Sequence, residues 1–187
     1  MTSRALEVEE YKNIIKLILS GFKTSENSVF RPNRQIALAF QLQASLGLRI
    51  GDVLALQVNN FKNGKLETRE QKTEKLQYRE INRDVYDYIK DFAIEKKLSP
   101  NNRLFNIGVR ETQKQLKTVT NYLGLDNIST HSFRKMNATI AYEDNGHNLE
   151  LVKELLNHTS VATTQRYIRV SQQIINTASA KMNFINI

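Results

Sequence analysis

The spacing of hydrophobic residues along this chain changes from helical to strand-like once and then becomes helical again. This change limits the possible folds more than any other feature of the sequence. Up to Leu46 the apolar residues recur every three or four positions, which predicts helices. Residues 65–71 and 75–81 alternate in type and are rich in Thr, Tyr, Leu and Ile, which predicts a β-hairpin. Helical spacing resumes after Asn82. The pattern therefore predicts an α+β fold that is mainly α-helical and has one small antiparallel β-hairpin or sheet.

Apolar spacing and helix-ending residues place the individual helices. The first helix should bury the residues spaced by three and four near the start, namely Val8, Tyr11, Ile15, Ile18 and Phe22. A second helix is expected after Pro32 and should end at Gly47, and a third should cover residues 52–57. After the hairpin, Asn82 can cap a helix. Further helices are expected over residues 112–123, 130–141 and 149–156, and residues 171–182 are compatible with a weakly amphipathic helix.

The composition excludes several classes of protein. The 187 residues suffice for one domain with a hydrophobic core. Because there is no cysteine, a disulfide scaffold, a thiolate zinc finger, an iron–sulfur protein and a thiol protease are excluded. The longest apolar stretches, residues 14–22 and 36–48, contain Lys or Gln and are shorter than the roughly 18 apolar residues that a membrane span needs. Met1 does not lead into a secretory signal pattern.

The charge balance points to an acidic partner. The chain has 27 Lys and Arg against 19 Asp and Glu, so its net charge is 27 − 19 = +8 with neutral histidine. On a folded domain, nucleic acid is the commonest partner of such an excess. The alternative is a basic surface that only maintains solubility.

Several residues could carry chemistry, although each has an ordinary explanation when taken alone. His131 and Arg134 are three apart near the start of a helix, so they could grip a phosphate together or be a solvated surface pair. Tyr167 becomes a nucleophile only beside cations or a base, and otherwise it is a packing residue. Arg49 lies between two helices, where an ion pair with Asp52 is the local alternative.

The hairpin adds a further candidate. Lys72 lies where the two predicted strands meet, in a region where lysines and arginines are mixed with glutamates. Its long side chain could reach a DNA groove, or the hairpin could simply be a solvated surface of mixed charge.

Taken in order, these segments resemble the catalytic signature of the tyrosine recombinase (phage integrase) family. The resemblance rests on Gly-Leu-Arg at 47–49 with an acidic residue three positions later, and on Lys-Thr-x-Lys at 72–75. His-x-x-Arg at 131–134 and Leu-x-His at 156–158, followed nine residues later by Tyr167, complete it. Each motif is weak alone, but their shared order is not expected by chance. The resemblance covers essentially the whole chain and implies the fold of the family's catalytic domain.

The resemblance assigns a role to each matching residue. Tyr167 would attack a DNA phosphate, form a 3′-phosphotyrosyl bond and release a 5′-hydroxyl. Arg49 and Arg134 would hold the non-bridging oxygens as charge builds up, and removing one such donor typically lowers the rate by about 10² to 10³. Lys72 would protonate the leaving 5′-oxygen.

The remaining assignments concern residues that assist this reaction. His131 would help to take the proton of Tyr167, and His158 would hydrogen-bond the phosphate. Asp52 would orient the cations without touching the substrate. The cations would supply the charge that magnesium provides in many nucleases, so we expect no metal and no other cofactor. This implies metal-independent cleavage and rejoining of DNA by a recombinase of a mobile element, for example in DNA integration.

The resemblance also implies partners and an assembly. The expected partner is double-stranded DNA, and we expect a homotetramer on DNA, a monomer or weak oligomer without it, and a cytoplasmic, nucleoid-associated location. The chain begins almost at the catalytic domain, so residues 1–187 are expected to form one such domain without the family's N-terminal core-binding domain. Residues 171–187 either dock on a neighbouring protomer or pack on their own core. Further DNA contacts are expected from Lys75, Arg79, Arg110, Lys114 and Lys117.

The chain departs from the family pattern at two places, and two rival functions fit much of the same pattern. Asn157 stands where the family most often has glycine, and Gly51-Asp52 stands where Ser-Glu is commoner. A DNA-binding regulator without catalysis would share the charge and the fold, although it would not need all the motif residues. A topoisomerase-like enzyme that relaxes DNA would use the same residues, because it also cleaves and rejoins one strand.

Overall fold

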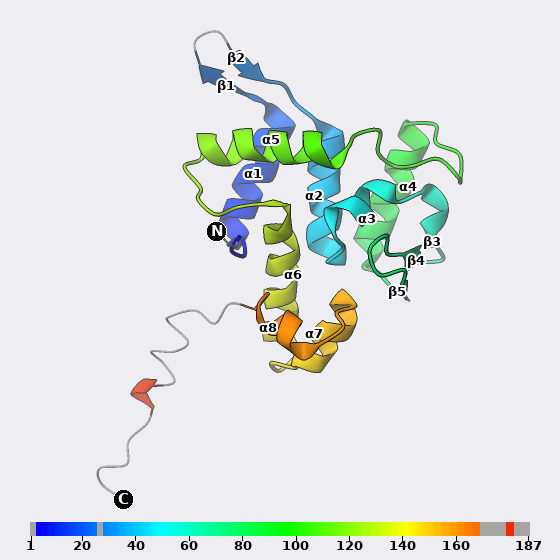
Figure 1. The fold of residues 1–187 in the computed structure, drawn as a ribbon. Coiled ribbons are helices and arrows are strands. Elements are labelled where there is room, and N and C mark those ends of the chain that lie inside the picture. The colour runs from blue at the N-terminus through cyan, green and yellow to red at the C-terminus, as the bar shows by residue number, and fades with distance from the viewer. Residues whose placement is uncertain (1–2, 26–27, 169–178, 182–187) are drawn as a thin grey trace, which may run out of the picture.

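The computed structural model describes residues 3–25, 28–168 and 179–181. Helices dominate it, and two small antiparallel sheets complete the fold (Figure 1). In chain order the elements are α1 (Val8–Ser20), β1 (Phe22–Ser25), β2 (Ser28–Phe30), α2 (Arg34–Leu46), α3 (Ile50–Ala55), the 3₁₀ turn η1 (Val58–Asn60), β3 (Phe61–Lys62), β4 (Lys65–Arg69), β5 (Leu76–Glu80), α4 (Arg83–Glu95), α5 (Val109–Tyr122), α6 (Thr130–Asp144), α7 (Leu149–Leu156) and α8 (Val161–Gln165).

The hydrophobic core is built around α2. This helix buries apolar side chains on several sides, since α1, α3 and α6 all pack against it. Phe40 of α2 stacks on Phe133 of α6, with ring centroids 4.4 Å apart. Such aromatic contacts add to the free energy gained by burying apolar surface. The core therefore fixes where α2 ends relative to the start of α6.

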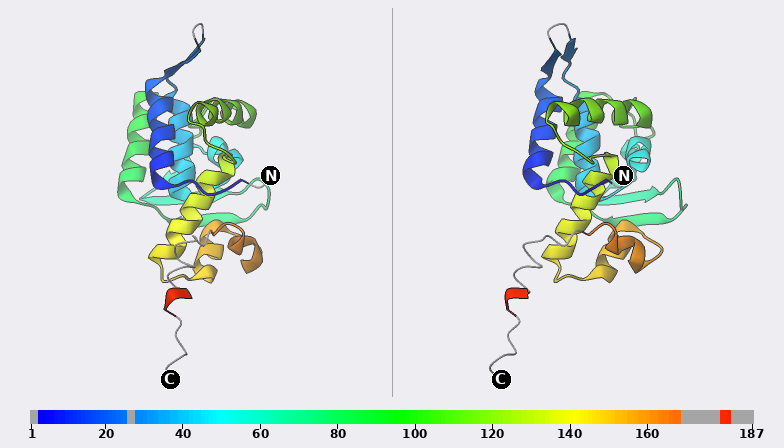
Figure 2. Two further views of the ribbon diagram at one scale, coloured as in Figure 1. Left: turned by 90° about the vertical axis from the view of Figure 1, so that its left-hand side faces the viewer. Right: turned by 60° about the vertical axis from the view of Figure 1, so that its left-hand side comes forward.

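The hairpin predicted from the alternating segments is present. β4 pairs with β5 in antiparallel register from Lys65↔Glu80 to Arg69↔Leu76, and the short β3 adds a third strand beside β4. Figure 2 shows that this hairpin extends beside α7 and α8, the orange helices near the C-terminal end. The turn of the hairpin and the end of α7 are thereby brought to one part of the molecule.

A second, smaller apolar cluster holds the C-terminal helices. Ala138 of α6 packs with Val152 and Leu156 of α7, and Tyr167 contacts this cluster. The placement of Tyr167 therefore depends on how α7 packs against α6.

The helix-ending residues were predicted well from the sequence. Gly47 ends α2 in the left-handed conformation with φ 62°, and Gly124 follows α5 with φ 65°. Asn82 caps α4 by accepting a hydrogen bond from the backbone N–H of Asp84. Glycine and asparagine reach positive φ, or cap helices, more readily than most residues, which explains why these positions could be predicted.

Other boundaries were wrong. Phe22 is not on the first helix but begins β1, because Gly21, with φ 70°, ends α1. The third helix spans Ile50–Ala55 and not residues 52–57, since Arg49 is already its N-cap. The hairpin of β1 and β2 and the five-residue α8 were not predicted, because both are too short to show a period.

Two expectations concern the C-terminal segment and membrane-spanning helices. Most of the segment 171–187, including its predicted helix and its docking surface, lies outside the described residues. Within residues 3–25, 28–168 and 179–181, no helix has the length and apolar character to cross a membrane.

Candidate functional site

The site is built where the C-terminal ends of α2 and α7 meet. Both helices end in a residue with left-handed backbone, Gly47 with φ 62° and Asn157 with φ 55°. An asparagine tolerates this conformation better than most non-glycine residues, so Asn157 can stand where the related family more often has glycine. The last carbonyl groups of a helix lack partners within the helix, and here they face two arginines.

Arg134 and Arg79 join these two helix ends. Arg134 donates from Nη1 to the carbonyl oxygen of Gly47 at 2.5 Å and from Nη2 to that of Leu156 at 2.7 Å. Arg79 donates to the carbonyl oxygen of Leu155 at 2.6 Å and also to that of Leu46. The negative ends of two helix dipoles thus stabilise two neighbouring cations.

Burial makes these two cations unusual. The side chain of Arg134 is fully buried, and burial together with the charge of Arg49 lowers its pKa. Burial and the nearby Arg134 lower the pKa of Arg79 to about 10. Arg79 was predicted as a DNA contact, but its guanidinium is bonded to internal carbonyls. Its position therefore supports an internal role, joining β5 to the ends of α2 and α7.

Arg49 is held by a carboxylate that no sequence motif indicated. Its Nη1 lies 2.6 Å from Glu70 Oε2 and 4.0 Å from Asp52 Oδ2. The local pair with Asp52 is therefore the weaker of the two contacts. Glu70 follows β4, and its side chain has no exposed surface. Only the folded hairpin brings it to Arg49, so no local sequence signal could have identified it.

Asp52, which was predicted to orient the cations, contacts the hairpin turn more closely than it contacts Arg49. Its Oδ1 accepts a hydrogen bond from the backbone N–H of Gln71 at 2.9 Å, which ties α3 to the hairpin turn. Its side chain is 3% exposed, and Oδ2 has no hydrogen-bond partner in the described structure. Burial raises the pKa of Asp52, because the charged carboxylate is desolvated.

Lys72 lies exposed in the turn between β4 and β5. It is close enough to His131 for its charge to contribute to lowering the pKa of that histidine. Lys75, one of the predicted DNA contacts, lies half-buried and acts in the same way on His158. The hairpin therefore brings the charges of both lysines within range of the histidines.

The pKa values of both motif histidines are lowered, which favours their neutral forms. His131 lies near the N-terminus of α6, where partial burial of its ring and the charges of Arg134 and Lys135 lower its pKa. Burial and the charges of Arg134 and Arg49 lower the pKa of His158 to about 4. Its Nδ1 is 3.0 Å from Thr164 Oγ1, whereas its Nε2 has no partner within the described residues.

Tyr167 lies just beyond α8, against His158 and two cations. Its ring meets the ring of His158 edge-on, with the centroids 4.7 Å apart. The guanidinium carbon of Arg134 is 5.8 Å from the ring centroid, and Lys135 Nζ is 5.6 Å away. Lys135, which belongs to no motif named above, is largely buried and donates to the carbonyl oxygen of Ser3. The phenol thus has cationic neighbours, as a tyrosine nucleophile requires.

The predicted residues are brought together in part. Arg49, Arg134, His158 and Tyr167 are linked by direct contacts or by the charge effects described above. No hydrogen bond or ring contact joins His131 to Tyr167 in the described structure. The three remaining predicted DNA contacts are exposed on α5: Arg110, Lys114 and Lys117. The start of α5 lies near α3, since a Cβ built on Gly51 would be 4.0 Å from Val109.

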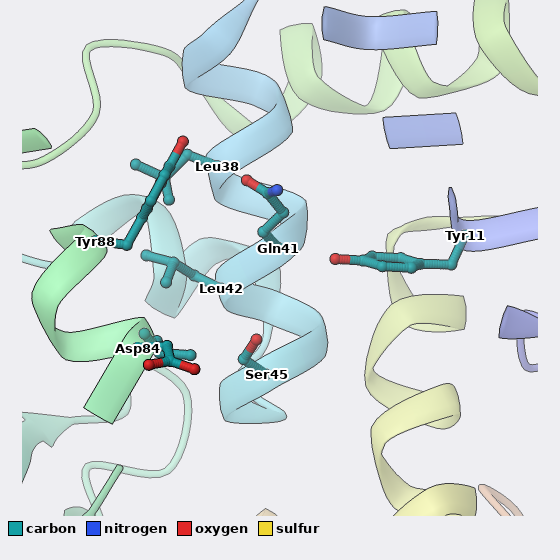
Figure 3. Close-up of a pocket in the computed structure, with 8 residues that line it drawn as sticks. Tyr11, Leu38, Gln41, Leu42, Ser45, Asp84 and Tyr88 are labelled. Atoms are coloured by element: carbon teal, nitrogen blue, oxygen red, sulfur yellow. The ribbon is translucent and has the colours of Figure 1, made fainter. Parts of the chain in front are cut away.

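Outside this site, the described structure contains a pocket but no cluster of metal ligands. Within the described ranges, no group of three or more His, Asp or Glu side chains is placed to hold a metal ion. A pocket lies between α1, α2 and α4, and Figure 3 shows Tyr11, Gln41 and Tyr88 around it. None of the predicted catalytic residues lines this pocket.

Comparison with solved structures defines the class of this fold. The catalytic domain of bacteriophage HP1 integrase superposes with a TM-score of 0.65 at 18% identity, covering 98% of each chain. The XerH site-specific recombinase bound to difH substrate superposes with a TM-score of 0.66 at 22% identity, covering 95% of this chain and 54% of that one. The fold is that of a tyrosine recombinase catalytic domain.

The sequence comparison then gives the family. The profile of the phage integrase family matches residues 5–173, so the chain belongs to that family. A probable integrase/recombinase of Acholeplasma phage L2 is 28% identical over 174 residues, which are 87% of this chain. The match spans 58% of the length of that relative.

Proposed function

We propose that this chain cleaves and rejoins double-stranded DNA as a site-specific recombinase, through a 3′-phosphotyrosyl intermediate on Tyr167. One observation carries the proposal: the ring of Tyr167 meets the ring of His158 at 4.7 Å and lies 5.8 Å from the guanidinium carbon of Arg134. Membership of the phage integrase family supports it. The XerH neighbour, which is bound to its difH substrate, supports double-stranded DNA as the partner.

In the proposed attack, Tyr167 forms one bond and loses one proton. Its Oη would form a bond to the scissile phosphorus while the bond from phosphorus to the 5′-oxygen breaks. The phenolic proton would pass to His131, which is free to accept it because its lowered pKa leaves it neutral. Lys72 would give a proton to the leaving 5′-oxygen, because an alkoxide is a poor leaving group.

Positive charge and hydrogen-bond donors would stabilise the transition state. Arg49 and Arg134 would face the non-bridging oxygens, where negative charge develops. If the hydroxyl of Thr164 donates to Nδ1 of His158, the histidine proton lies on Nε2, which would then donate to the phosphate. These groups supply the charge that a metal ion supplies in other nucleases, which is why we propose a metal-independent reaction.

Rejoining would run through the same atoms in reverse. A 5′-hydroxyl would attack the phosphotyrosyl phosphorus and give its proton to Lys72, while the bond from phosphorus to Tyr167 Oη breaks and His131 returns a proton to that oxygen. The energy of the original phosphodiester is kept in the phosphotyrosyl bond, so no nucleotide cofactor is required. Strand exchange between two duplexes would need four active sites, and we propose a homotetramer on DNA for that step.

The test is detection of a covalent protein–DNA adduct on denaturing gels, with nicked DNA of a candidate recombination site and excess chelator. The unmutated chain should form the adduct, and Tyr167→Phe should not, while its DNA affinity stays within a few fold. Tyr142→Phe is a matched control, since Tyr142 is on α6 and contacts His147. An adduct formed equally by Tyr167→Phe would contradict the proposal, as would a requirement for a divalent metal.

A further inference from the structure

Glu70 is a buried carboxylate that the proposed reaction does not use. Its side chain has no exposed surface, although carboxylates are almost never fully buried unless they are paired. Both of its oxygens are occupied: Oε2 accepts from Arg49 Nη1 and from Thr73 Oγ1, each at 2.6 Å, and Oε1 accepts from Gln77 Nε2 at 3.2 Å. The carboxylate is therefore fixed in position by groups on three sides.

The backbone of Glu70 also closes the turn that carries Lys72. Its N–H donates to the carbonyl oxygen of Lys75 at 3.0 Å, and its carbonyl oxygen accepts from the N–H of Glu74 at 2.9 Å. The hydrogen bond from Thr73, which directly follows Lys72, holds the same turn from the side-chain end. Glu70 therefore holds both Arg49 and the turn that carries Lys72.

The contact leaves most of Arg49 available. A guanidinium has five N–H donors, and the bond to Glu70 uses Nη1. No hydrogen bond from Nε or Nη2 of Arg49 occurs within the described structure. Asp52 cannot replace Glu70 here, because it lies 4.0 Å from Arg49 and its Oδ1 is bound to the N–H of Gln71.

Charge effects agree with this placement. Burial would raise the pKa of Glu70, but the hydrogen bond from Thr73 and the ion pair with Arg49 outweigh burial and lower it. Glu70 is thus ionised at neutral pH. Its negative charge also acts on Arg79, Arg134 and His158, so one carboxylate partly balances the whole cationic cluster.

We propose that Glu70 is a positioning residue that holds the guanidinium of Arg49 and the ammonium of Lys72 in a fixed position relative to each other. This inference rests on the proposed function, in which Arg49 acts on the non-bridging oxygens of a phosphate and Lys72 on the leaving oxygen of the same phosphate. Because a displacement of about 1 Å can lower a rate about 10²-fold, a shared anchor for both groups would matter for the chemical step more than for DNA binding.

The test compares Glu70→Gln with Glu74→Gln, which removes the same charge from an exposed position in the same turn. Single-turnover cleavage is measured on ordinary DNA and on DNA with sulfur in place of the bridging 5′-oxygen. A thiolate leaves without a proton, so the sulfur substrate bypasses Lys72. Lys72→Ala shows how much the sulfur substrate restores cleavage when the proton donor is absent altogether.

Glu70→Gln should cleave ordinary DNA about 10²-fold more slowly, with DNA affinity within a few fold. The sulfur substrate should recover part of that loss, whereas Glu74→Gln should match the unmutated chain on both substrates. Normal cleavage by Glu70→Gln would overturn the inference. A loss that the sulfur substrate does not reduce at all would also overturn it, since Lys72 would then not be involved.

Two additions keep the result interpretable. If Glu70→Gln does not fold, Thr73→Val removes one of the bonds to the carboxylate and should show a smaller loss with the same partial recovery; full activity of Thr73→Val would then overturn the inference. If the unmutated chain forms no adduct on either substrate, the proposed function itself fails. If the unmutated chain forms the adduct and Glu70→Gln cleaves as fast as it does, the proposed function stands and the role of Glu70 is rejected.

Discussion

His158 makes the stability of this domain depend on pH. Its pKa falls from 6.5, the ordinary value, to about 4 in the folded chain, mainly because the ring is buried. Between these values the unfolded chain binds more protons than the folded chain, so the free energy of unfolding should fall as the pH is lowered. The loss should be fully developed near pH 4 and should amount to roughly 3 kcal/mol.

Urea unfolding at several pH values from 7.5 to 4 checks this prediction. His131, whose pKa is also lowered, should contribute in the same direction. The variant His158→Gln should show a flatter dependence than the unmutated chain, because it lacks the main titrating group. Identical pH dependence in the two proteins would contradict the neutral, buried state of His158.

Arg134 should prove structural as well as catalytic. Replacing it by alanine removes the donors to the carbonyl oxygens of Gly47 and Leu156 and leaves both buried acceptors without a partner. Arg134→Ala should therefore lower the free energy of unfolding by about 3 kcal/mol in urea titrations. Arg110→Ala, at an exposed position on α5, should leave it within about 0.5 kcal/mol. Equal stability of the two variants would contradict the bridging role.

At the level of single residues, the sequence predicted Asp52 as a support for the candidate site, but it did not reveal the supporting contacts of Glu70 and Lys135. Tyr167, Arg134 and His158 belong to short motifs whose order could be read along the chain. Glu70 and Lys135 have no such motif, because their contacts depend on elements that meet only in the folded chain. Arg79 looked like a surface cation for the same reason: the carbonyls that bind it come from distant helices.

Among the elements, the end of α2 is tightly constrained. Gly47 has φ +62°, and a Cβ placed there would lie 2.5 Å from Asn137 Oδ1 and 3.0 Å from Leu156 Cδ2. Gly124 has a similar φ of +65°, but a Cβ there would meet no atom within 4 Å. Substituting each of these two glycines therefore separates the free-energy cost of a left-handed backbone from the cost of steric crowding.

Gly124→Ala should lower the free energy of unfolding by about 1 kcal/mol, which is the strain of a left-handed alanine. Gly47→Ala should lower it by about 2 kcal/mol more, because α2, α6 and α7 would have to move apart. Thermal and urea unfolding of both variants measure the difference. Similar losses would mean that the end of α2 is packed loosely enough to accept a methyl group.

The elements differed in how well they could be predicted, for physical reasons. The strands β4 and β5 alternate over enough residues to show their period, and Gly47, Asn82 and Gly124 mark ends by their backbone preferences. The β1–β2 hairpin and α8 are too short for a period to show, and they are held mainly by their neighbours. Phe22, for example, stacks on Phe30 across the hairpin.

For the whole molecule, the net charge of +8 should govern affinity for DNA. Replacing Lys114 and Lys117 on α5 by glutamine should weaken binding to all sequences alike. The slope of log affinity against log salt should fall by about one unit for each phosphate that is no longer neutralised. Lys12→Gln on α1, where Lys12 pairs with Glu9, is the control and should change neither. An unchanged salt slope in the α5 variant would exclude α5 from the DNA interface.

Sequence patterns predict less about the whole protein than about its residues and elements. The fold class could be predicted from the periods, and the family from the motifs, because both are properties of one chain. Site choice and the proposed assembly on DNA would depend on surfaces contributed by several molecules. The chain matches 58% of the length of the Acholeplasma phage relative.

Locating the covalent bond itself is the sharpest test of the proposed chemistry. The chain is trapped on a nicked substrate, the adduct is digested with protease and nuclease, and the modified peptide is sequenced by mass spectrometry. We expect one nucleotide, joined through its 3′-phosphate to the phenolic oxygen of Tyr167. Attachment to another residue, or through the 5′-phosphate, would contradict the proposed mechanism.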